Sequence, residues 1–135
     1  MINPFTTVKR WHRRFKFDQE PMTLEKLDFR MQLQTEEHDE LRQAHYDKNP
    51  EEIVDALVDT IWIACGTLDL LGVDFDKAFS EVARANNEKK RGIKPGRENS
   101  GGFDVLKPAN WKAPSHKGNW GILSELFENN DGKQD

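Results

Sequence analysis

The chain has 135 residues, of which 36% are apolar and 33% charged, and it carries a formal net charge of −4. This length fits one domain, so we expect a single domain over residues 1–135. A lone cysteine, Cys65, excludes a disulfide framework and favours the cytoplasm. The N-terminus lacks the apolar segment of a signal peptide, and Asp55, Asp59 and Asp69 interrupt the longest apolar run, which argues against a membrane span.

Charge is distributed unevenly along the chain. Residues 8–17 carry five basic and no acidic side chains, residues 18–81 carry 17 acidic and 5 basic ones, and residues 84–118 carry nine basic and three acidic ones. An acidic middle between basic ends indicates a metal site next to a region that binds phosphate. A solvated acidic face is the alternative explanation.

Three helices are predicted in the first two thirds of the chain. The first runs over about residues 23–46, with Thr23 as its N-cap. The second has the clearest start, because Asn49-Pro50-Glu51-Glu52 combines a cap residue, a proline at the first helical position and a glutamate at the third. It should end at Gly72. The third covers about residues 74–89, and its predicted buried side carries Phe75, Ala78, Phe79 and Val82.

The segment from Arg91 to Gly118 differs in character from the helices before it. Eight glycines and prolines interrupt any regular element there, and the segment is basic. Loops of this length are usually functional or disordered. A short amphipathic helix follows, with Trp120, Leu123, Leu126 and Phe127 on its apolar side. Because strand signals are weak throughout, we predict an all-α helical bundle over about residues 23–90, with an irregular basic segment over about 91–118.

The second helix carries carboxylates where an apolar helix should have none. At about 100° per residue, one stripe of it is apolar and comprises Ile53, Leu57, Ile61, Ala64, Leu68 and Leu71. The narrow polar wedge holds Glu52, Asp55 and Asp59. Carboxylates on such a helix must be exposed at an edge, paired or bound to a metal, because a lone buried charge costs several kcal/mol.

A matching acidic face lies on the first helix. Glu36, Glu37 and Glu40 share it, with Gln34 and Arg30 one and two turns earlier. If the two helices pack antiparallel, the clusters face each other and offer a site for a hard cation, Mg²⁺ or Mn²⁺. The alternative is a solvated glutamate face, with Glu52 acting only as a capping residue.

Two other site chemistries find little support. A di-iron bundle needs Glu-x-x-His pairs, and neither His38 nor His45 follows a glutamate at that spacing. Nucleophilic catalysis would need a reactive thiol, whereas Cys65 lies in an apolar helix and is expected to be a packed core residue.

An ordered series of motifs resembles the all-α nucleoside triphosphate pyrophosphohydrolases. This MazG-like superfamily includes dimeric dUTPases and phosphoribosyl-ATP pyrophosphohydrolase. Its Glu-Glu-x-x-Glu helix is matched by residues 36–40, and residues 55–62 and 66–74 resemble the next helix and its end. Residues 81–89 resemble a third block ending in Asn-x-x-Lys. Leu106-Lys107-Pro108 with Trp111 resembles a C-terminal block of phage and bacterial members, so the resemblance covers roughly residues 23–114.

The second motif departs from the family pattern. Many members have a glutamate three residues before the aspartate of this helix, but here Ala56 precedes Asp59. Either Asp55 replaces that glutamate, or the pair Glu52-x-x-Asp55 corresponds to the glutamate and aspartate of the family pattern. The set of expected metal ligands is therefore Glu37, Glu40, Asp55, Asp59 and Glu52.

The resemblance implies hydrolysis of a (deoxy)nucleoside triphosphate to the monophosphate and pyrophosphate, which would control nucleotide pools. It implies a Mg²⁺ cofactor that lowers the pKa of a bound water, with Glu36 or Glu37 as the general base. Arg84, Lys89 and Lys107 would neutralise phosphate oxygens, and Asn86 would contact a phosphate or the sugar.

Base recognition needs a stacking surface and groups that read the base edge. Trp11, Phe15, Phe17 and Trp62 are candidates for stacking, and Gln34 or Arg30 for contacts with the base edge. We also expect the basic segment to be mobile and to close over the triphosphate, with Lys107 at the phosphates and Trp111 at the rim. A rigid loop with Trp111 packed in place is the alternative.

Two further expectations concern partners. A polar chain with one strongly apolar helix should form a homodimer or a larger homo-oligomer. The rival functional class is a nucleic-acid-binding helical module that uses the basic N-terminal and C-terminal segments. The net charge of −12 over residues 18–81 makes nucleic acid the less favoured partner.

Overall fold

The computed structural model describes residues 1–131 and is mostly helical, which confirms the all-α class. The chain forms two compact units, one comprising Met1–Phe75 with the residues from Trp120 onward, and the other Asp76–Asn119. In chain order the elements are α1 (Pro4–Arg14), α2 (Leu24–Tyr46), α3 (Pro50–Leu71), α4 (Phe75–Asn87), β1 (Lys90–Arg91), β2 (Val105–Leu106) and α5 (Leu123–Asp131). Two short 3₁₀ turns lie at Phe17–Gln19 and Glu98–Ser100.

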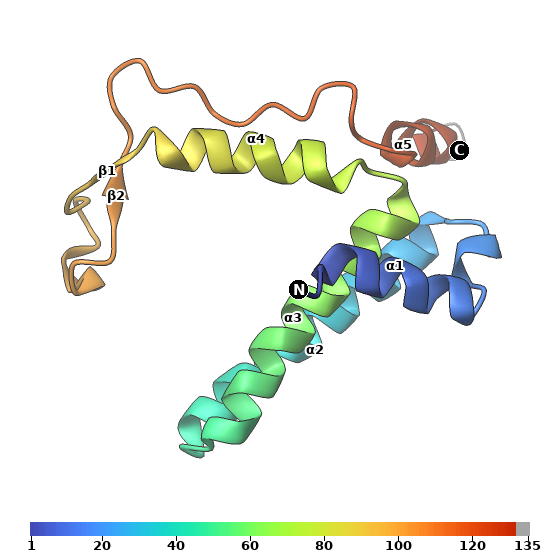
Figure 1. The fold of residues 1–135 in the computed structure, drawn as a ribbon, viewed down its shortest axis with the longest axis horizontal. Coiled ribbons are helices and arrows are strands. Elements are labelled where there is room, and N and C mark those ends of the chain that lie inside the picture. Colours follow the sequence, from blue (N-terminus) through green and yellow to red (C-terminus); the bar gives the residue numbers. More distant parts are fainter. Residues whose placement is uncertain (132–135) are drawn as a thin grey trace. The chain divides into compact units, whose positions relative to one another are not determined.

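An antiparallel pair of long helices, α2 and α3, is the main feature of the first unit (Figure 1). Thr23 caps α2, since its Oγ1 accepts a hydrogen bond of 3.2 Å from the backbone N–H of Lys26. Asn49 caps α3 in the same way through the N–H of Glu52, and Gly72 ends that helix at a φ of 74°. The predicted bounds and caps of both helices are therefore confirmed.

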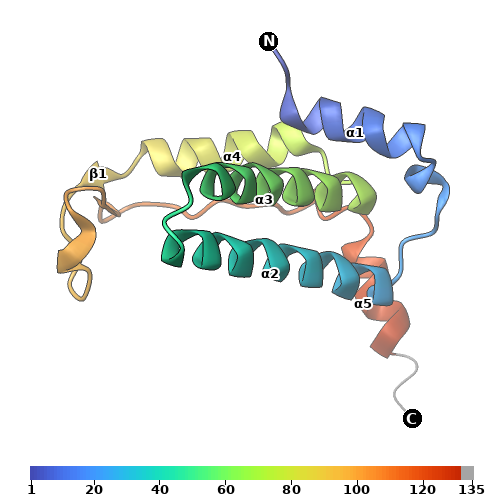
Figure 2. The same ribbon diagram turned by 90° about the horizontal axis from the view of Figure 1, so that it is seen from below.

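The first helix, α1, was missing from the predicted core, which was placed at about residues 23–90. Figure 2 shows it as a separate helix ahead of α2. It begins at Asn3, whose Oδ1 accepts a hydrogen bond of 3.0 Å from the N–H of Thr6, and Pro4 occupies its first position. This Asn-Pro start is the same signal that marks α3. The core of the first unit therefore includes α1, which packs on α3.

A buried hydrogen bond between two side chains fastens α1 to α3. His12 is 1% exposed, and its Nδ1 lies 2.8 Å from Oδ2 of Asp69. A ring contact reinforces this packing, because Trp11 of α1 meets Trp62 of α3 with ring centroids 5.5 Å apart. At the other end of α1, Phe5 stacks on Phe75, the first residue of α4, with ring centroids 4.6 Å apart. Aspartate at position 69 therefore has a structural role, since it pairs with the imidazole that anchors α1.

The same part of α3 also receives α2. Arg30 donates from Nε to Oγ1 of Thr67 at 3.0 Å and from Nη2 to the carbonyl of Ile63 at 2.9 Å. Gly66 lies between these contacts, and a Cβ there would approach Nη2 of Arg30 to 2.6 Å and the ring of His12 to 3.1 Å. The glycine therefore allows both neighbouring helices to approach α3 closely.

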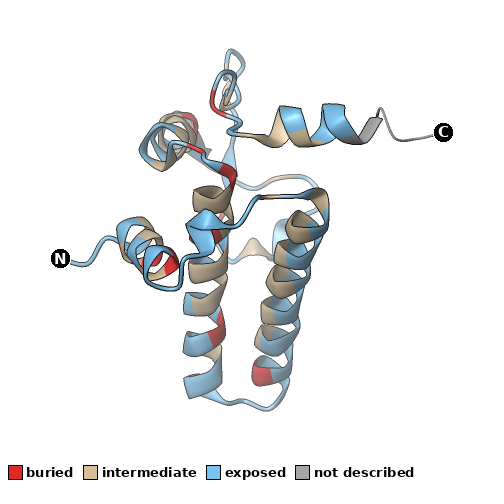
Figure 3. Cartoon of the chain, turned by 90° about the vertical axis from the view of Figure 1, so that its right-hand side faces the viewer, coloured by how far each residue is buried: buried red, intermediate tan, exposed pale blue. Residues whose placement is uncertain are grey.

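The outer sides of the helices are largely exposed (Figure 3). On α3, Leu71 is buried as the predicted apolar stripe requires, and Cys65 is a buried thiol as expected. Leu57 and Ile61 belong to the same stripe but are exposed in the single chain. Phe79 of α4 was predicted on the buried side of its helix and is exposed, so that prediction is wrong. The helical period predicts where the apolar stripe of α3 lies, but it does not predict which surface covers that stripe.

The second unit combines α4 with a small hairpin and an extended segment. Strands β1 and β2 pair antiparallel, with Lys90 opposite Leu106 and Arg91 opposite Val105. The weak strand signal gave no indication of this two-residue pairing, because so short a ladder has no readable alternation. The fold class stays all-α.

Gly66→Ala should destabilise the protein by up to about 2 kcal/mol, since overpacking against Arg30 and His12 outweighs the helix propensity gained. Urea unfolding measures the change. The same substitution in an Arg30→Ala background should cost less, because the nearest obstructing atoms are gone. A Gly66→Ala variant as stable as the wild type would contradict this packing.

Candidate active site

Four carboxylates from the two long helices influence one another electrostatically. Glu37 and Glu40 lie one turn apart on α2, and Asp55 and Asp59 one turn apart on α3. The antiparallel packing of α2 and α3 brings both pairs within interaction range, since Glu37 is affected by both aspartates and Asp59 by Glu40. The predicted opposition of two acidic faces is thus present in the structure.

Glu37 has the most strongly altered acidity of the four. Burial raises its pKa to about 7, with further contributions from the charges of Glu40 and Asp59 and from a hydrogen bond with Glu40. Its Oε2 is buried and has no hydrogen-bond partner among residues 1–131. An orphaned carboxylate oxygen among like charges can be satisfied by a proton or a cation.

Asp59 is the corresponding group on α3. Burial raises its pKa, and the neighbouring charges of Asp55 and Glu40 raise it further. A hydrogen bond with Asp55 acts in the same direction. Both helices therefore contribute one carboxyl group that resists ionisation for the same two physical reasons, burial and nearby negative charge.

Glu36 and Glu52 lie apart from this interaction. Glu36 is exposed, and its Oε1 accepts a hydrogen bond of 3.2 Å from Nε2 of Gln32 on the same helix. Glu52 is an exposed residue in the first turn of α3, where its backbone N–H is capped by Asn49. Neither contributes to the raised pKa values of Glu37 and Asp59.

The carboxylates do not form a preassembled coordination shell. In the part of the chain that the structure describes, no group of three or more His, Cys, Asp or Glu side chains is arranged to hold a metal ion. The donor chemistry nevertheless fits a hard cation, because all four groups are oxygen ligands and one oxygen lacks a partner.

An aromatic cluster follows the carboxylates along α3. Trp62 lies one turn beyond Asp59 and meets Trp11 of α1 edge to face, with centroids 5.5 Å apart. Trp11 also contacts Phe15 and Phe17 at 5.2 and 5.5 Å. The structure therefore gathers all four predicted stacking residues.

The two predicted base-edge residues differ in their surroundings. Arg30 is held by its hydrogen bonds to α3, and burial lowers the pKa of its guanidinium group. Gln34 lies one turn further along α2 and is half-buried. Arg30 thus has a structural role in the helix pair whatever else it contacts.

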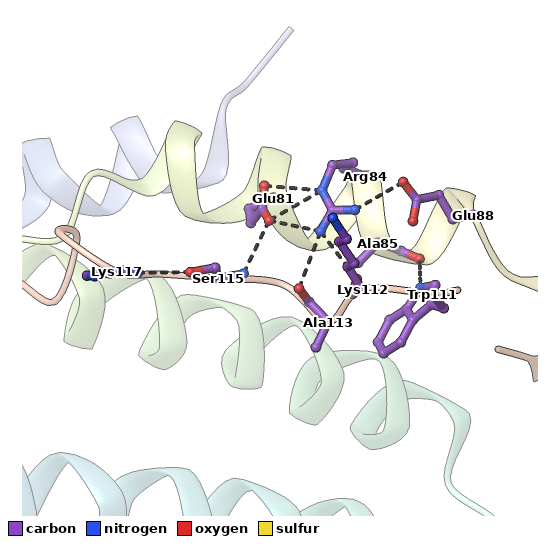
Figure 4. Close-up of polar contacts among 9 residues, drawn as sticks. All are labelled: Glu81, Arg84, Ala85, Glu88, Trp111, Lys112, Ala113, Ser115 and Lys117. Atoms are coloured by element: carbon purple, nitrogen blue, oxygen red, sulfur yellow. Dashed lines mark hydrogen bonds and ion pairs between the residues drawn. The ribbon is translucent and has the colours of Figure 1, made fainter. Parts of the chain in front are cut away.

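In the second unit, Arg84 ties α4 to the extended segment (Figure 4). It pairs with Glu81 at 2.9 Å and Glu88 at 3.0 Å, and its Nη2 donates to the carbonyls of Lys112 and Ala113. These contacts hold the pKa of Glu81 below its usual range and that of Arg84 above it. Sequence reasoning assigned Arg84 to phosphate and missed this structural role.

Trp111 brings the two predicted phosphate-binding lysines together. Its Nε1 donates to the carbonyl of Ala85 at 2.7 Å (Figure 4). The Nζ atoms of Lys89 and Lys107 lie 5.1 and 4.8 Å from the centroid of its indole ring, at cation–π distance. Asn86 is exposed on α4.

The basic segment is better anchored than its composition suggested. Beyond Trp111 and Arg84, the N–H of Ser115 donates to Glu81 at 3.2 Å, and Arg97 pairs with Asp104 at 2.7 Å. Glycine and proline content gave no signal of these polar contacts. Closure of the segment over a triphosphate stays a prediction.

Comparison with known families identifies the chain. The sequence profile of phosphoribosyl-ATP pyrophosphohydrolase matches residues 8–86, which run from α1 through nearly all of α4. The chain belongs to the phosphoribosyl-ATP pyrophosphohydrolase family. This family is a member of the all-α MazG-like superfamily, so the family drawn from the motifs is confirmed over residues 8–86. The motifs beyond residue 86 stay a resemblance. A search of curated proteins gave no match.

Family membership implies pyrophosphohydrolase activity on a nucleotide. The matched range includes α1, which the motif comparison left out because it began at residue 23. Within residues 1–131, no helix is long and apolar enough to span a membrane. The structural residues that sequence reasoning missed, His12 and Asp69, also lie inside the matched range.

The acidity of Glu37 predicts how stability depends on pH in the absence of metal. The folded protein keeps a proton on Glu37 up to a pKa of about 7, whereas the unfolded chain releases it near the ordinary value of 4.5. Wild-type stability should therefore fall relative to Glu37→Gln as pH rises between these values, by at most about 1.4 kcal/mol per pH unit.

Urea unfolding in EDTA from pH 4 to 8 measures this difference. Glu36→Gln is the matched control, because Glu36 is an exposed neighbour on the same helix. An equal pH dependence in the two variants would contradict the assignment of the raised pKa to Glu37.

Proposed function

We propose that the protein hydrolyses a (deoxy)nucleoside triphosphate to the nucleoside monophosphate and pyrophosphate. The observation that carries this proposal is the mutual repulsion of four carboxylates held across the α2–α3 pair. Proteins tolerate such a destabilising arrangement mainly where function requires it. Family membership supports the class of reaction, and the triphosphate substrate is our inference.

Glu37, Glu40, Asp55 and Asp59 are the residues that would hold Mg²⁺ or Mn²⁺. Family members are commonly dependent on a divalent metal. When bound, the cation would supply charge neutralisation at the phosphate oxygens and a more acidic water. Binding would also replace the proton on Glu37, because a positive charge among these groups lowers their pKa values.

The reaction breaks the α–β phosphoanhydride bond and adds a water across it. We assign the general base to Glu37 rather than Glu36. Glu37 lies among the carboxylates, and its Oε2 has no hydrogen-bond partner in the described part of the chain, whereas the Oε1 of Glu36 accepts a hydrogen bond from Gln32. The base would take the proton that the attacking water loses.

Substrate recognition is proposed from the predicted residues and their surroundings. Trp62, with Trp11 against it, supports base stacking, and Gln34 and Arg30 are the candidates for the base edge. For the phosphates we favour Lys89 and Lys107 over Arg84, because the two carboxylates beside Arg84 already neutralise its charge. Asn86 is proposed to contact the sugar or a phosphate. Trp111 is proposed to lie at the rim of the site that holds the triphosphate.

A chromatographic screen of all common NTPs and dNTPs with Mg²⁺ tests the proposal. Phosphoribosyl-ATP belongs in the same screen, because the family description names that substrate. Formation of a monophosphate and pyrophosphate from an NTP or dNTP is the expected result. Turnover of phosphoribosyl-ATP alone would overturn the triphosphate assignment and keep the reaction class.

Asp59→Asn should lower turnover at least about 100-fold, since a metal ligand contributes several kcal/mol of transition-state stabilisation. The same substitution should raise the melting temperature of the metal-free protein, because it removes one charge from the repelling group. Asp39→Asn, an exposed residue on α2, is the control and should change neither. Full wild-type activity in excess EDTA, or orthophosphate as the first product, would contradict the mechanism.

We also propose that the protein is a homodimer or a larger homo-oligomer assembled through α3. Four exposed apolar side chains follow the helical period on one side of that helix, each between 48% and 62% exposed: Val54, Leu57, Val58 and Ile61. Monomeric proteins rarely leave such a contiguous stripe in water. A second copy offers the same stripe and can cover it by two-fold symmetry.

Val58→Lys should convert the protein to a monomer, because a lysine at the centre of this stripe would place a charge in the interface. Light scattering at micromolar concentration measures the mass. Tyr46→Lys is the control, since Tyr46 is also an exposed apolar residue, at 82% against 54% for Val58, but lies at the end of α2. A wild-type protein that is monomeric and fully active at that concentration would contradict the proposal.

A further inference from the structure

Helix α1 separates its charges cleanly from its packing residues. At about 100° per residue, its basic side chains fall within an arc of about 140°: Lys9, Arg10, Arg13 and Arg14. The remaining arc carries the packing residues Phe5, Val8, Trp11 and His12. Lys16 adds a fifth cation directly after the helix, where its φ is 62°.

Among residues 1–131, none of these five cations forms an ion pair with an acidic side chain. Two of them lie over aromatic rings, Lys9 over Phe5 and Arg14 over Phe15. A chain of net charge −4 with an acidic middle thus presents five unneutralised positive charges over eight consecutive residues. Such a patch attracts anions, above all ones with several charges in a row.

Two exposed aromatic rings stand at the end of the same patch. Phe15 and Phe17 stack on each other, with centroids 5.8 Å apart and planes 23° apart. They remain 49% and 41% exposed, although Trp11 and His12 contact the inner side of Phe17. Flat exposed rings next to cations are the elements with which proteins bind unpaired bases and their phosphates.

We propose that this basic surface of α1, residues 9–17, binds single-stranded nucleic acid. Phosphates would contact the arc of lysines and arginines, and one or two bases would stack on Phe15 and Phe17. The cations of this surface are separate from the carboxylate site, because they lie on the side of α1 away from Trp11, which faces α3. Phe15 and Phe17 connect the two regions, since both rings contact Trp11. The proposal does not depend on the hydrolytic function.

Other occupants fit the surface less well. The bases of a duplex are stacked on one another, so they have no free faces on which Phe15 and Phe17 could stack. A membrane surface calls for an apolar helix face, but that face of α1 is already occupied by α3 and the ring cluster. A free nucleoside triphosphate offers only three phosphates, so it would leave part of the five-cation arc without an anion.

Fluorescence anisotropy with a labelled 12-nucleotide oligo(dT) and the full chain in EDTA tests the proposal. Five phosphate contacts predict that affinity falls about 100-fold between 50 and 200 mM salt, at a slope of about −0.7 per contact. The variant Arg10→Gln/Arg13→Gln/Arg14→Gln keeps two cations, so its affinity should be lower and fall only about 7-fold over that range. Its hydrolytic activity should equal that of the wild type.

Controls separate charge, stacking and location. Lys94→Gln/Lys112→Gln/Lys117→Gln removes three cations of the second unit, of which Lys112 and Lys117 are exposed and Lys94 is half-buried, and should leave binding unchanged. Phe15→Leu should weaken binding about tenfold without changing the salt slope, whereas Phe29→Leu, an exposed phenylalanine of α2, should not.

Several results would overturn the proposal. One is wild-type affinity in the arginine triple variant, and another is equally tight binding of a duplex of the same length. Displacement of the oligonucleotide by an equimolar nucleoside triphosphate would assign the surface to the substrate. Binding to anionic vesicles but not to the oligonucleotide would assign it to a membrane.

Discussion

Repulsion among Glu37, Glu40, Asp55 and Asp59 is the constraint on which the first unit depends. The charges of their neighbours raise the pKa values of Glu37 and Asp59 across the α2–α3 pair, so the proximity of the four groups lowers the stability of the metal-free fold. Caps at both helix starts and the packing of α1 hold the helices together despite that cost. The repulsion is relieved by protons or by a cation, and this links the stability of the unit to what the site binds.

One face of α3 organises the site and its supports. Asp55, Asp59, Trp62, Gly66 and Asp69 follow one another at intervals of four, three, four and three residues, which keeps them on one side of the helix. Along that face the surroundings change from carboxylates to aromatic rings, then to the close approach of α1 and α2, and finally to the pair with His12. Chemistry and packing thus occupy successive turns of a single helix.

The features that sequence could predict are those with local causes. Caps at Thr23 and Asn49 and the stop at Gly72 depend on neighbouring residues, so both long helices were placed correctly. Helix α1 was missed although Asn3-Pro4 repeats the cap signal of α3, because its basic residues were interpreted as a charged segment. The roles of Glu36 and Glu37 could not be separated, because adjacent residues differ by about 100° on a helix and only packing decides which of them faces α3.

In the second unit, the sequence could not show which basic side chains are already paired with carboxylates and which can still bind an anion. Arg84 is flanked by Glu81 and Glu88 and donates to backbone carbonyls, so its charge is already neutralised in holding the extended segment to α4. Lys89 and Lys107 instead lie over Trp111, and an aromatic ring attracts a cation without cancelling its charge. Two ammonium groups gathered around one ring repel each other, and a bound anion would relieve that repulsion. The same logic that applies to the carboxylates, with the sign of the charge reversed, therefore makes these lysines better candidates for phosphate than the arginine.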